Sequence, residues 1–418
     1  MLKKRSAVAC GVAAFVVSCA VYLLLGRHLT AEMRRMLDLE VYRSAGDAVR
    51  NHSRLYDLRF TAGLLPFTYP PFSALAFAPL SLISFAGLKD PVALATIASL
   101  LATAWLTLRA LGRSRTAETF ALAAAVCAVG LWLEPVQQTL RLGQVNAVLM
   151  LLVVADLSRA RDSRWSGVGV GLATGFKLTP AIFVLYLVVR HRRAAAVRAV
   201  GTFAATVALG FLILPSDARH FWLDRVFLDS SRVGSADYVA NQSLHGVIAR
   251  VVGTGTGGSF LWITAATVTL GAGIWTAAQL ADSYGEIVGV MACALTGLLV
   301  SPISWSHHWV YVVPALAVGV HFALRTRNSS LVAAVGVLLL LFLAWPARFQ
   351  PGEPHVPGGL IWLPSGTAGG DYHWTLSEAV LGNADLIVGS AIFVAVALLA
   401  LSTRASRAAA ELQVVSGS

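Results

Sequence analysis

Apolar runs long enough to cross a lipid bilayer recur along almost the whole chain. The first covers Ala7 to Leu25, and others lie at about 70–88, 91–111, 117–133, 144–157, 166–190, 194–214, 259–281, 286–303, 308–324, 330–346 and 385–402. A transmembrane helix needs about 20 mostly apolar residues, and only segments that satisfy their own backbone hydrogen bonds can span lipid. We therefore expect an all-α polytopic membrane protein with about 10–12 transmembrane helices.

The composition agrees with this fold class and excludes others. Of the 418 residues, 57% are hydrophobic and 13% are charged, which is too little charge for the surface of a soluble protein of this length. The net charge of +11 does not indicate nucleic-acid binding, because the basic residues fall in short clusters between apolar runs. The four cysteines lie within apolar runs without CxxC spacing, which predicts neither disulfides nor a metal site.

Basic residues at the two ends of the chain predict its orientation. The sequence begins MLKKR before the first apolar run, and Arg404 and Arg407 follow the last one. The first run resembles a signal peptide but lacks a convincing cleavage site, so we interpret it as a retained helix. By the positive-inside rule both ends face the cytoplasm, which makes 404–418 a cytoplasmic tail. The loops then expected on the outer face of the plasma membrane are 26–69, 215–258, 301–307 and 347–384.

The middle of the chain fits the charge rule less simply. Strict alternation of the runs would place several arginines outside, namely Arg113, Arg115, Arg159, Arg161 and Arg164. The rule is obeyed if 70–88 does not fully cross and 166–190 is a broken or re-entrant hairpin. The sequence TGFKLTP at 174–180 permits such a break. The whole of 1–418 is expected to form a single membrane domain.

The first outer loop, 26–69, is polar and too rich in pattern to be a simple connector. Apolar residues recur there at helical spacing and predict an amphipathic helix on the membrane surface: Met33, Met36, Leu37, Val41, Ala45, Ala48 and Val49. Thr30 is a suitable cap for this helix, and Glu32 suits its first turn. Asp38 and Tyr42 are four residues apart, so they lie together on a neighbouring face.

Asp38 is the main candidate for a catalytic base. A carboxylate at the mouth of a membrane bundle can deprotonate a hydroxyl group. Glu40 is two residues away and points elsewhere on a helix, which favours one acting group over a pair that chelates a cation. Asp57 is the competing carboxylate. The alternative interpretation is that Asp38 and Glu40 are part of a solvated helix face.

Lys177 lies inside an apolar segment, where an ammonium group costs at least about 2.5–3.5 kcal/mol on insertion scales. A functional interpretation is an anionic lipid phosphate as its partner, and the alternative is a lysine that reaches the interface. His307 and His308 lie at the outer end of a run between tryptophans. Either can carry charge or donate a hydrogen bond beside a phosphate, although we expect only one to face the site. No third ligand follows at metal spacing, so zinc is not expected.

Two weaker polar patches complete the candidates. Arg141, Gln144 and Asn146 fall near an outward membrane boundary and are candidates for substrate binding. The sequence NQSLH at 241–245 lies in an outer loop and reads either as a glycosylation sequon or as a substrate-facing segment.

These pieces occur in an order that resembles glycosyltransferase family 87, the polyprenol-phosphate-mannose-dependent α-1,2-mannosyltransferases. The resemblance covers roughly residues 7–400. It is carried by DLEVY at 38–42, LYD at 55–57, LPFTYPP at 65–71, GQVN at 143–146, KLTP at 177–180, NQSL at 241–244 and the His307–His308 segment.

The resemblance implies a GT-C fold, an active site that faces away from the cytoplasm, and a polyprenyl-phosphate-mannose donor. The acceptor implied is the mannose 2-hydroxyl of a mannosylated glycolipid or lipoglycan. By position the catalytic carboxylate is Asp38, with Tyr42 and Tyr69 against the sugars. The sequence has Asp-x-Glu where many GT-C enzymes have Asp-x-Asp, so we expect neither a metal nor another cofactor. An arabinofuranosyl or glucosyl donor is an alternative, and a lipid-linked sugar flippase or transporter is the alternative from another class.

Overall fold

The computed structural model describes residues 2–28, 31–348, 355–364 and 372–416, and helices dominate these ranges. Regular strand structure among them is one short hairpin, in which β1 (Pro346–Ala347) pairs antiparallel with β2 (Val356–Pro357). The expected all-α fold class is therefore confirmed.

In the described part of the chain six helical segments are long and apolar enough to cross a membrane. They belong to α1 (Leu2–His28), α4 (Phe85–Ala110), α10 (Arg193–Ile213), α13 (Thr256–Tyr284), η6 (Ser306–Tyr311) with α15 (Val312–Thr326), and α18 (Ala384–Ser416). A seventh results if α6 (Glu134–Leu142) and α7 (Asn146–Leu157), which are bent by 119° to each other, count as one span. These helices make the chain a multi-pass membrane protein.

Further apolar helices of 10–17 residues accompany these spans. They are α3 (Pro71–Phe77) with η2 (Ala78–Leu82), α5 (Ala117–Gly130), η3 (Thr179–Ala181) with α9 (Ile182–Val189), α14 (Glu286–Val300) and α16 (Ser329–Phe342). The expected count of 10–12 crossings depends on how many of these shorter helices span, and stays a prediction.

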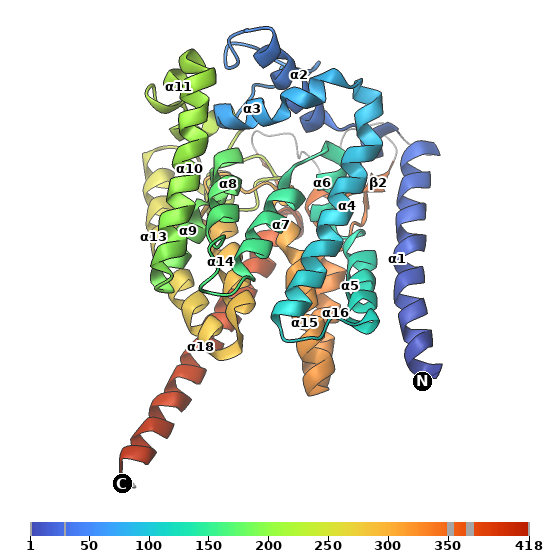
Figure 1. Ribbon diagram of the computed structural model, residues 1–418, viewed down its shortest axis with the longest axis vertical. Helices are drawn as coiled ribbons and strands as arrows, with labels where there is room; N and C mark the ends of the chain where they lie inside the picture. Colours follow the sequence, from blue (N-terminus) through green and yellow to red (C-terminus); the bar gives the residue numbers. More distant parts are fainter. Residues whose placement is uncertain (1, 29–30, 349–354, 365–371, 417–418) are drawn as a thin grey trace.

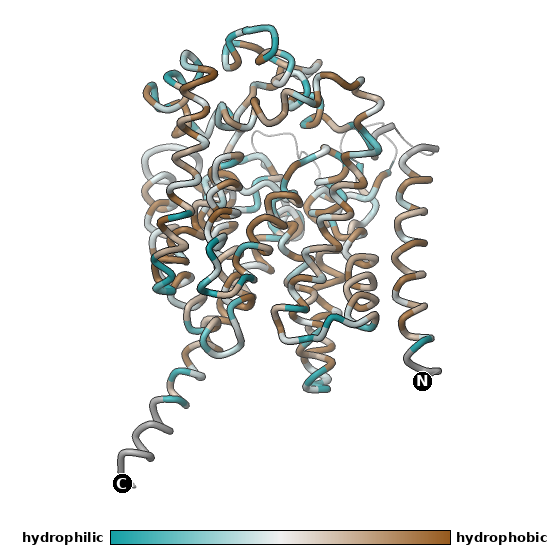
Figure 2. Tube along the Cα trace, in the orientation of Figure 1, coloured by the Kyte–Doolittle hydropathy of each residue, from teal (hydrophilic) through white to brown (hydrophobic). Residues whose placement is uncertain are grey.

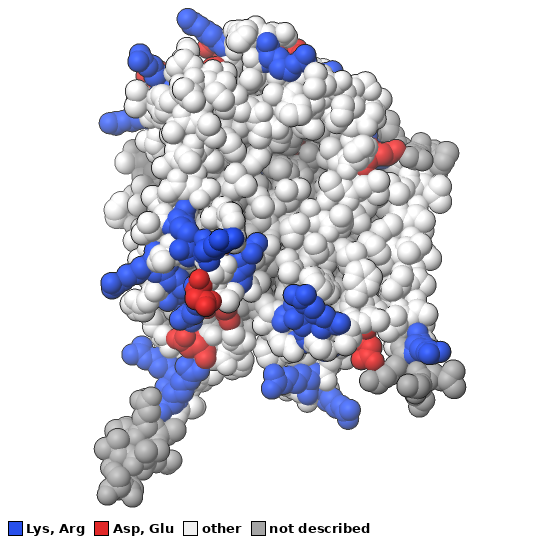
Figure 3. Space-filling view, viewed as in Figure 1, with Lys and Arg blue, Asp and Glu red and all other residues white. Residues whose placement is uncertain are grey.

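Figure 1 shows both ends of the chain at the lower end of the bundle, where α1 and α18 begin and finish. The helices α2 (Leu37–Arg50) and α3 lie across the upper end instead of crossing. Hydrophobic positions fill the bundle between the two ends, and hydrophilic ones gather at the loops (Figure 2). On the visible face, Lys and Arg lie mainly over the lower part of the molecule and at its upper end (Figure 3). This distribution is that of a protein embedded in lipid.

The segment 166–190 is a re-entrant hairpin made of α8 (Val168–Phe176), η3 and α9. Its two ends meet, because Arg192 Nη2 donates to Ser166 Oγ at 2.8 Å, and Lys177 lies at its tip. The preceding loop lies at the same end as the C-terminal helix. There Arg161 pairs with Glu286, and Arg407 donates to the carbonyl of Asp282. The expected break at 174–180 is confirmed. The cytoplasmic placement of the arginines stays a prediction.

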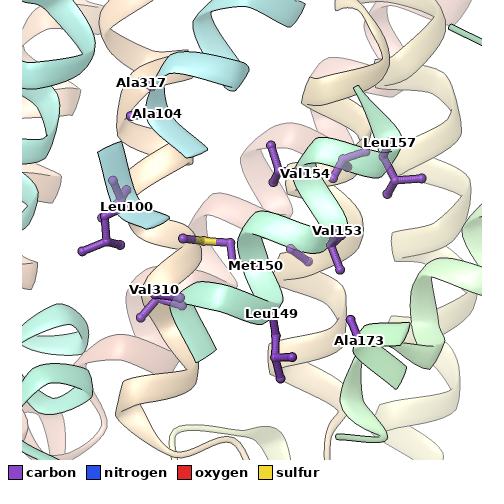
Figure 4. Packing of buried hydrophobic residues seen from close by; sticks show 14 of the residues in the cluster. Leu100, Ala104, Leu149, Met150, Val153, Val154, Leu157, Ala173, Val310 and Ala317 are labelled. Carbon is purple, nitrogen blue, oxygen red and sulfur yellow. The ribbon is translucent and has the colours of Figure 1, made fainter. Parts of the chain in front are cut away.

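The helix α7 lies in the centre of the hydrophobic core. Figure 4 shows Met150 pointing toward Leu100 of α4 and Val310 of η6, while Ala173 of α8 lies on the other side of α7. These side chains are at most 1% exposed. Because α7 begins at Asn146, this packing fixes the polar turn just before it.

The loop 26–69 differs from expectation at its start. The helix α2 begins at Leu37, after a separate turn η1 (Ala31–Arg34), and not near Thr30. Met36 separates the two in a left-handed conformation, with φ of 51°. Thr30 and the side chain of Glu32 lie outside the described residues. The apolar stripe itself is confirmed, since Met33, Met36, Val41, Ala45 and Ala48 are buried and Leu37 and Val49 are half-buried.

Short elements in the loops 215–258 and 347–384 were not anticipated from the sequence. They are α11 (Pro215–Trp222), η4 (Val226–Leu228), η5 (Ser230–Arg232), α12 (Leu244–Val252), η7 (Leu360–Trp362) and α17 (Leu376–Gly382). Their apolar patterns are too short to stand out beside the membrane runs.

Candidate functional site

A cavity of about 650 Å³ opens below α2 and collects most of the polar residues singled out in the sequence. Its lining includes Asp38, Tyr42, Tyr69, Gln144, Lys177, His307 and His308. Apolar side chains of α9, α13 and α14, such as Leu185, Leu270 and Val300, form another part of the wall. A cavity with a few convergent polar groups and a large apolar wall suits an amphipathic ligand.

The helix α2 is held over the cavity by the turn between α6 and α7. The backbone N–H of Met36 donates to the carbonyl of Arg141 at 2.7 Å. Gly143 closes α6 with φ of +69°, and a Cβ there would lie 2.7 Å from Cβ of Leu39. A glycine permits both the left-handed conformation and this close approach. The first turn of α2, which carries Asp38, is thereby set at the cavity.

Gln144 connects α2 with the loop that precedes α3. Its Nε2 donates to Oδ2 of Asp38 at 2.6 Å. Its Oε1 accepts from the hydroxyls of Tyr42 and Tyr69, at 2.8 and 3.2 Å. The two hydroxyl oxygens are also 3.0 Å apart. Residues far apart in the sequence therefore form one hydrogen-bonded group on the cavity wall.

Lys177 reaches the same group from the tip of the re-entrant hairpin. Its Nζ lies 3.1 Å from the Tyr69 hydroxyl, 3.0 Å from Oδ1 of Asn146 and 2.9 Å from Nε2 of His308. An ammonium group has three donors and no acceptor, so it donates to all three partners. Nε2 of His308 is then the acceptor, and a neutral ring carries its proton on Nδ1. The buried charge is stabilised without a carboxylate in direct contact.

The two histidines differ in their surroundings. His307 is buried, and among the described residues its Nε2 has no hydrogen-bond partner. Its carbonyl accepts from Asn146 Nδ2 at 3.0 Å and from Thr139 Oγ1 at 3.2 Å. Both imidazoles line the cavity. The expectation that only one of them faces the site is wrong, because the residues lie in a 3₁₀ turn and their rings meet edge to face.

The surroundings of Asp38 favour a proton acceptor that works near neutral pH. Burial raises the pKa of Asp38 to about 6, while the hydrogen bond from Gln144 and the charge of Lys177 act in the opposite direction. Burial also raises the pKa of Tyr42 and of Tyr69 above the ordinary value for a phenol. Both tyrosines therefore stay protonated, and the carboxylate is the group in this network that can take up a proton at pH 7.

The competing carboxylates lie elsewhere. Asp57 is exposed and pairs with Arg54 at 3.8 Å, outside the cavity lining. Glu40 is half-buried and does not line the cavity either. Among the carboxylates considered as bases, the geometry favours Asp38.

Two expectations about the binding residues need revision. Arg141 does not line the cavity; its side chain lies near Gln138, with Nη1 3.5 Å from Oε1. Asn146 does not line it either. Its Oδ1 accepts a hydrogen bond from Lys177, and its Nδ2 donates to the carbonyl of His307.

The segment 241–245 supports the site from behind. Asn241 and Gln242 are fully buried, which excludes the sequon and the substrate-facing interpretation. Oδ1 of Asn241 accepts from the N–H of Ser304 at 2.9 Å, and the N–H of Gln242 donates to the Ser304 carbonyl at 2.8 Å. These bonds hold the chain that leads into His307 and His308.

Sequence reasoning missed the outer part of the cavity wall. Phe227, Asp229 and Arg232 line it, as does Trp305. Arg232 donates to the carbonyl of Phe67 at 3.3 Å and lies over the ring of Tyr56. A loop arginine of this kind has no signal in a single sequence, since its place depends on how the 215–258 loop folds.

In the part of the chain that the structure describes, no group of three His, Cys, Asp or Glu side chains is placed to hold a metal ion. Asp38 and Glu40 do not form a chelating pair at the cavity. The expectation of metal-independent chemistry stays a prediction.

Comparison with known proteins identifies a family and several similar sequences. A family model described as glycosyltransferase family 87 matches residues 67–302. A polyprenol-phosphate-mannose-dependent alpha-(1-2)-phosphatidylinositol pentamannoside mannosyltransferase of Mycobacterium tuberculosis (strain CDC 1551 / Oshkosh) is 36% identical over 344 residues, which are 78% of either chain.

A second relative comes from Mycolicibacterium smegmatis. It is a polyprenol-phosphate-mannose-dependent alpha-(1-2)-phosphatidylinositol mannoside mannosyltransferase, 32% identical over 382 residues and 86% of either chain. No solved structure matches the chain. The family match includes Tyr69, Gln144 and Lys177 but ends before the histidines and begins after Asp38. The placement of those residues thus rests on the geometry of the cavity.

Proposed function

The chain belongs to glycosyltransferase family 87, and from this premise we propose that it transfers mannose from polyprenyl-phosphate-mannose to a mannose 2-hydroxyl, forming an α-1,2 linkage with inversion. It is a polyprenol-phosphate-mannose-dependent mannosyltransferase. The acceptor we propose is a phosphatidylinositol mannoside, which the names of its relatives contain, or a related lipomannan or lipoarabinomannan. The observation that carries the proposal is one cavity shared by Asp38, Lys177 and the two histidines.

In the proposed reaction Asp38 takes the proton of the acceptor hydroxyl as its oxygen attacks the anomeric carbon. The bond between that carbon and the phosphate oxygen breaks on the opposite face, so a β-mannosyl phosphate gives an α-mannoside. Oδ2 of Asp38 accepts a hydrogen bond from Nε2 of Gln144, and no described side chain donates a hydrogen bond to Oδ1. That oxygen is therefore available to the hydroxyl. Help from a general base of this kind contributes typically 10²–10⁴-fold to the rate.

The leaving polyprenyl phosphate gains one negative charge as the bond breaks. Lys177, His307 and His308 line the cavity and supply positive or hydrogen-bonding groups for it. Among the described residues Nε2 of buried His307 has no hydrogen-bond partner, so in the tautomer protonated at Nε2 it offers a donor to a phosphate oxygen. Since the N–H groups of Lys177 already have protein partners, a phosphate at this site replaces one of them, and Tyr69 and His308 are the two partners that also line the cavity. The apolar wall formed by α9, α13 and α14 suits the polyprenyl chain.

We place this chemistry at the outer face of the plasma membrane. The support is the lower end of the bundle, where α1 begins, α18 ends and Arg161 of the loop before α8 lies. The positive-inside rule assigns that end to the cytoplasm. The cavity lies below α2, which crosses the opposite end (Figure 1).

The test is mannose transfer by the whole protein in membranes. Membranes that contain the chain are incubated with radiolabelled polyprenyl-phosphate-mannose and a panel of phosphatidylinositol mannosides, and the new linkage is mapped. We expect an α-1,2-linked mannose on one of the acceptors. Transfer from an arabinofuranosyl or glucosyl polyprenyl phosphate, and none from the mannosyl donor, would instead support the alternative sugar.

The matched variant is Asp38→Asn, which keeps the size of the side chain and removes the basic oxygen. We expect transfer to fall by at least about 10²-fold while the protein still inserts and folds. Near-normal transfer by this variant, with donor and acceptor present, would remove Asp38 as the base.

A further inference from the structure

The polar atoms of the Gln144 side chain are hydrogen-bonded to other protein side chains, which leaves little capacity to bind a sugar. Its carbonyl oxygen has two lone pairs, and two tyrosine hydroxyls use them. Its amide nitrogen donates to Asp38 in the shortest contact of the group, 2.6 Å. The side chain is 6% exposed. Most of its polar capacity is therefore spent on the protein.

The direction of these hydrogen bonds is determined by the groups at the two ends. An ammonium group at Lys177 only donates, so the Tyr69 oxygen accepts from it and the Tyr69 proton is free to point to Oε1 of Gln144. An ionised Asp38 only accepts, so it requires the amide N–H₂ on its side. Turning the amide over would place its oxygen against a carboxylate oxygen. The order Lys177, Tyr69, Gln144, Asp38 thus runs from donor to acceptor without a conflict.

The backbone around Gln144 is held as firmly as its side chain. Its N–H donates to the carbonyl of Thr139 at 2.9 Å, which closes the end of α6. The next helix, α7, begins at Asn146 in the centre of the core. An amide anchored in this way can hold a neighbouring carboxylate in one rotamer.

We propose that Gln144 is a positioning residue for the base, which holds Oδ2 of Asp38 so that Oδ1 faces the incoming hydroxyl and the carboxylate stays ionised. This inference rests on the proposed function of Asp38. It replaces the expectation that Gln144 binds substrate. Tyr42 and Tyr69 act one step further away, since they fix the carbonyl oxygen of Gln144.

Several other titratable groups face Asp38 and enter any pH dependence. They are Tyr42 on its own helix, Tyr69 before α3, Lys177 at the tip of the hairpin, and His307 and His308 across the cavity. None of them donates directly to Asp38 in the described structure, whereas Gln144 does. Loss of that donor removes stabilisation from the charged form of the carboxylate alone.

The test compares Gln144→Met with Gln138→Met in the mannose transfer assay. Both changes replace a buried glutamine by an uncharged side chain of similar length, and Gln138 lies in α6 away from the cavity lining. For Gln144→Met we expect kcat to fall about 10- to 100-fold, and the acid midpoint of the kcat profile to rise by about one pH unit. KM for the donor should stay within about twofold. For Gln138→Met the midpoint should not move.

A second variant separates positioning from folding. Gln144→Glu keeps the size and polarity of the side chain and brings another carboxyl group next to Asp38, so the acid midpoint should rise further than in Gln144→Met. A rise in KM for acceptor or donor with an unchanged midpoint in both variants would overturn the proposal and return Gln144 to substrate binding. If wild-type protein transfers no mannose at all, the proposed function fails before this question arises.

Discussion

At the scale of single residues, Asp38 faces opposing demands. To act as the base that we propose, it must lose its proton, yet it lies where burial favours the neutral acid. Gln144 and Lys177 offset part of that cost through a hydrogen bond and a positive charge. The result is a carboxyl group with a pKa of about 6, which suits general-base catalysis near neutral pH.

The pH dependence of transfer follows from this pKa. Because the folded-state pKa of about 6 lies above the ordinary value, protonation removes the base as the pH falls through 6. We expect kcat/KM to be level above about pH 7 and to fall about tenfold for each pH unit below the midpoint. An acid midpoint near 4 in the pH profile of membranes containing the wild-type protein would contradict this assignment.

Ionisation of Asp38 affects the stability of the fold in the opposite sense to transfer activity: it lowers the stability and permits the activity. A raised carboxyl pKa means that the folded state holds the proton more tightly than the unfolded state, so ionisation of Asp38 costs stability as the pH rises toward neutrality. The Asp38→Asn variant should therefore match or exceed the wild type in thermal midpoint at pH 7. Such a result would also show that its loss of transfer is not a loss of fold.

The residues of the site were partly predictable because charge in an apolar segment is conspicuous. Lys177 and the two histidines stood out for this reason, and Asp38 through its place on an amphipathic helix. The role of Gln144 was not predictable, because its partners lie far away in the sequence. Arg141 was assigned to the site by its neighbours, but the end of α6 turns its side chain toward Gln138.

At the scale of elements, two interruptions of regular helix place the chemistry. The break after α8 carries Lys177 into the cavity, and the turn between α6 and α7 carries Gln144 there. The first was predictable from Gly175 and Pro180, which disfavour a continuous helix. The 119° bend of the second was not, because the apolar runs on either side read as separate spans. The start of α2 also depends on tertiary contacts, since Met36 adopts its left-handed conformation where its N–H reaches Arg141.

Gly143 offers a test of how α2 is seated. Gly143→Ala adds a Cβ 2.7 Å from Cβ of Leu39 and keeps a φ of +69° that disfavours alanine. We expect a loss of stability of roughly 2–3 kcal/mol and at least about a tenfold loss of transfer, because the first turn of α2 must move. Thermal unfolding and the transfer assay on the purified protein measure the two effects.

Gly112→Ala is the matched control for this variant. Gly112 also has a positive φ, of +86°, but a Cβ there meets no atom within 4 Å. The Gly112→Ala variant should lose only about 1 kcal/mol of folding stability through backbone strain, and it should retain its transfer activity. Equal loss of transfer in both variants would mean that the contact with Leu39 is not what positions α2.

At the scale of the whole molecule, ion pairs connect several helices at the lower end of the bundle. Glu286 at the start of α14 lies within 4 Å of the guanidinium groups of Arg161, Arg190 and Arg192. Arg190 also pairs with Asp282, whose carbonyl accepts from Arg407 of α18. Arg161, one of the arginines that complicated the sequence-based topology, thus lies at the same end of the bundle as the C-terminal helix, because 166–190 turns back.

This arrangement predicts the topology that labelling can measure. Single cysteines are introduced at two exposed positions, Ala62→Cys in the first outer loop and Asp162→Cys in the loop before α8. A membrane-impermeant maleimide should label position 62 in intact cells and position 162 only after permeabilisation. The unsubstituted protein gives the background from its four native cysteines. The opposite pattern would place the cavity on the cytoplasmic side.

The apolar wall of the cavity has a consequence for how substrates arrive. Leu185 of α9 belongs to that wall and is 40% exposed, so the cavity offers apolar surface to a hydrocarbon chain beside its polar groups. A lipid donor that reaches this wall from the bilayer keeps its hydrocarbon tail in the leaflet and never passes through water. The turnover rate then depends on two-dimensional diffusion and on the number of donor molecules per unit area of membrane. Stirring or dilution of the aqueous phase leaves this rate unchanged.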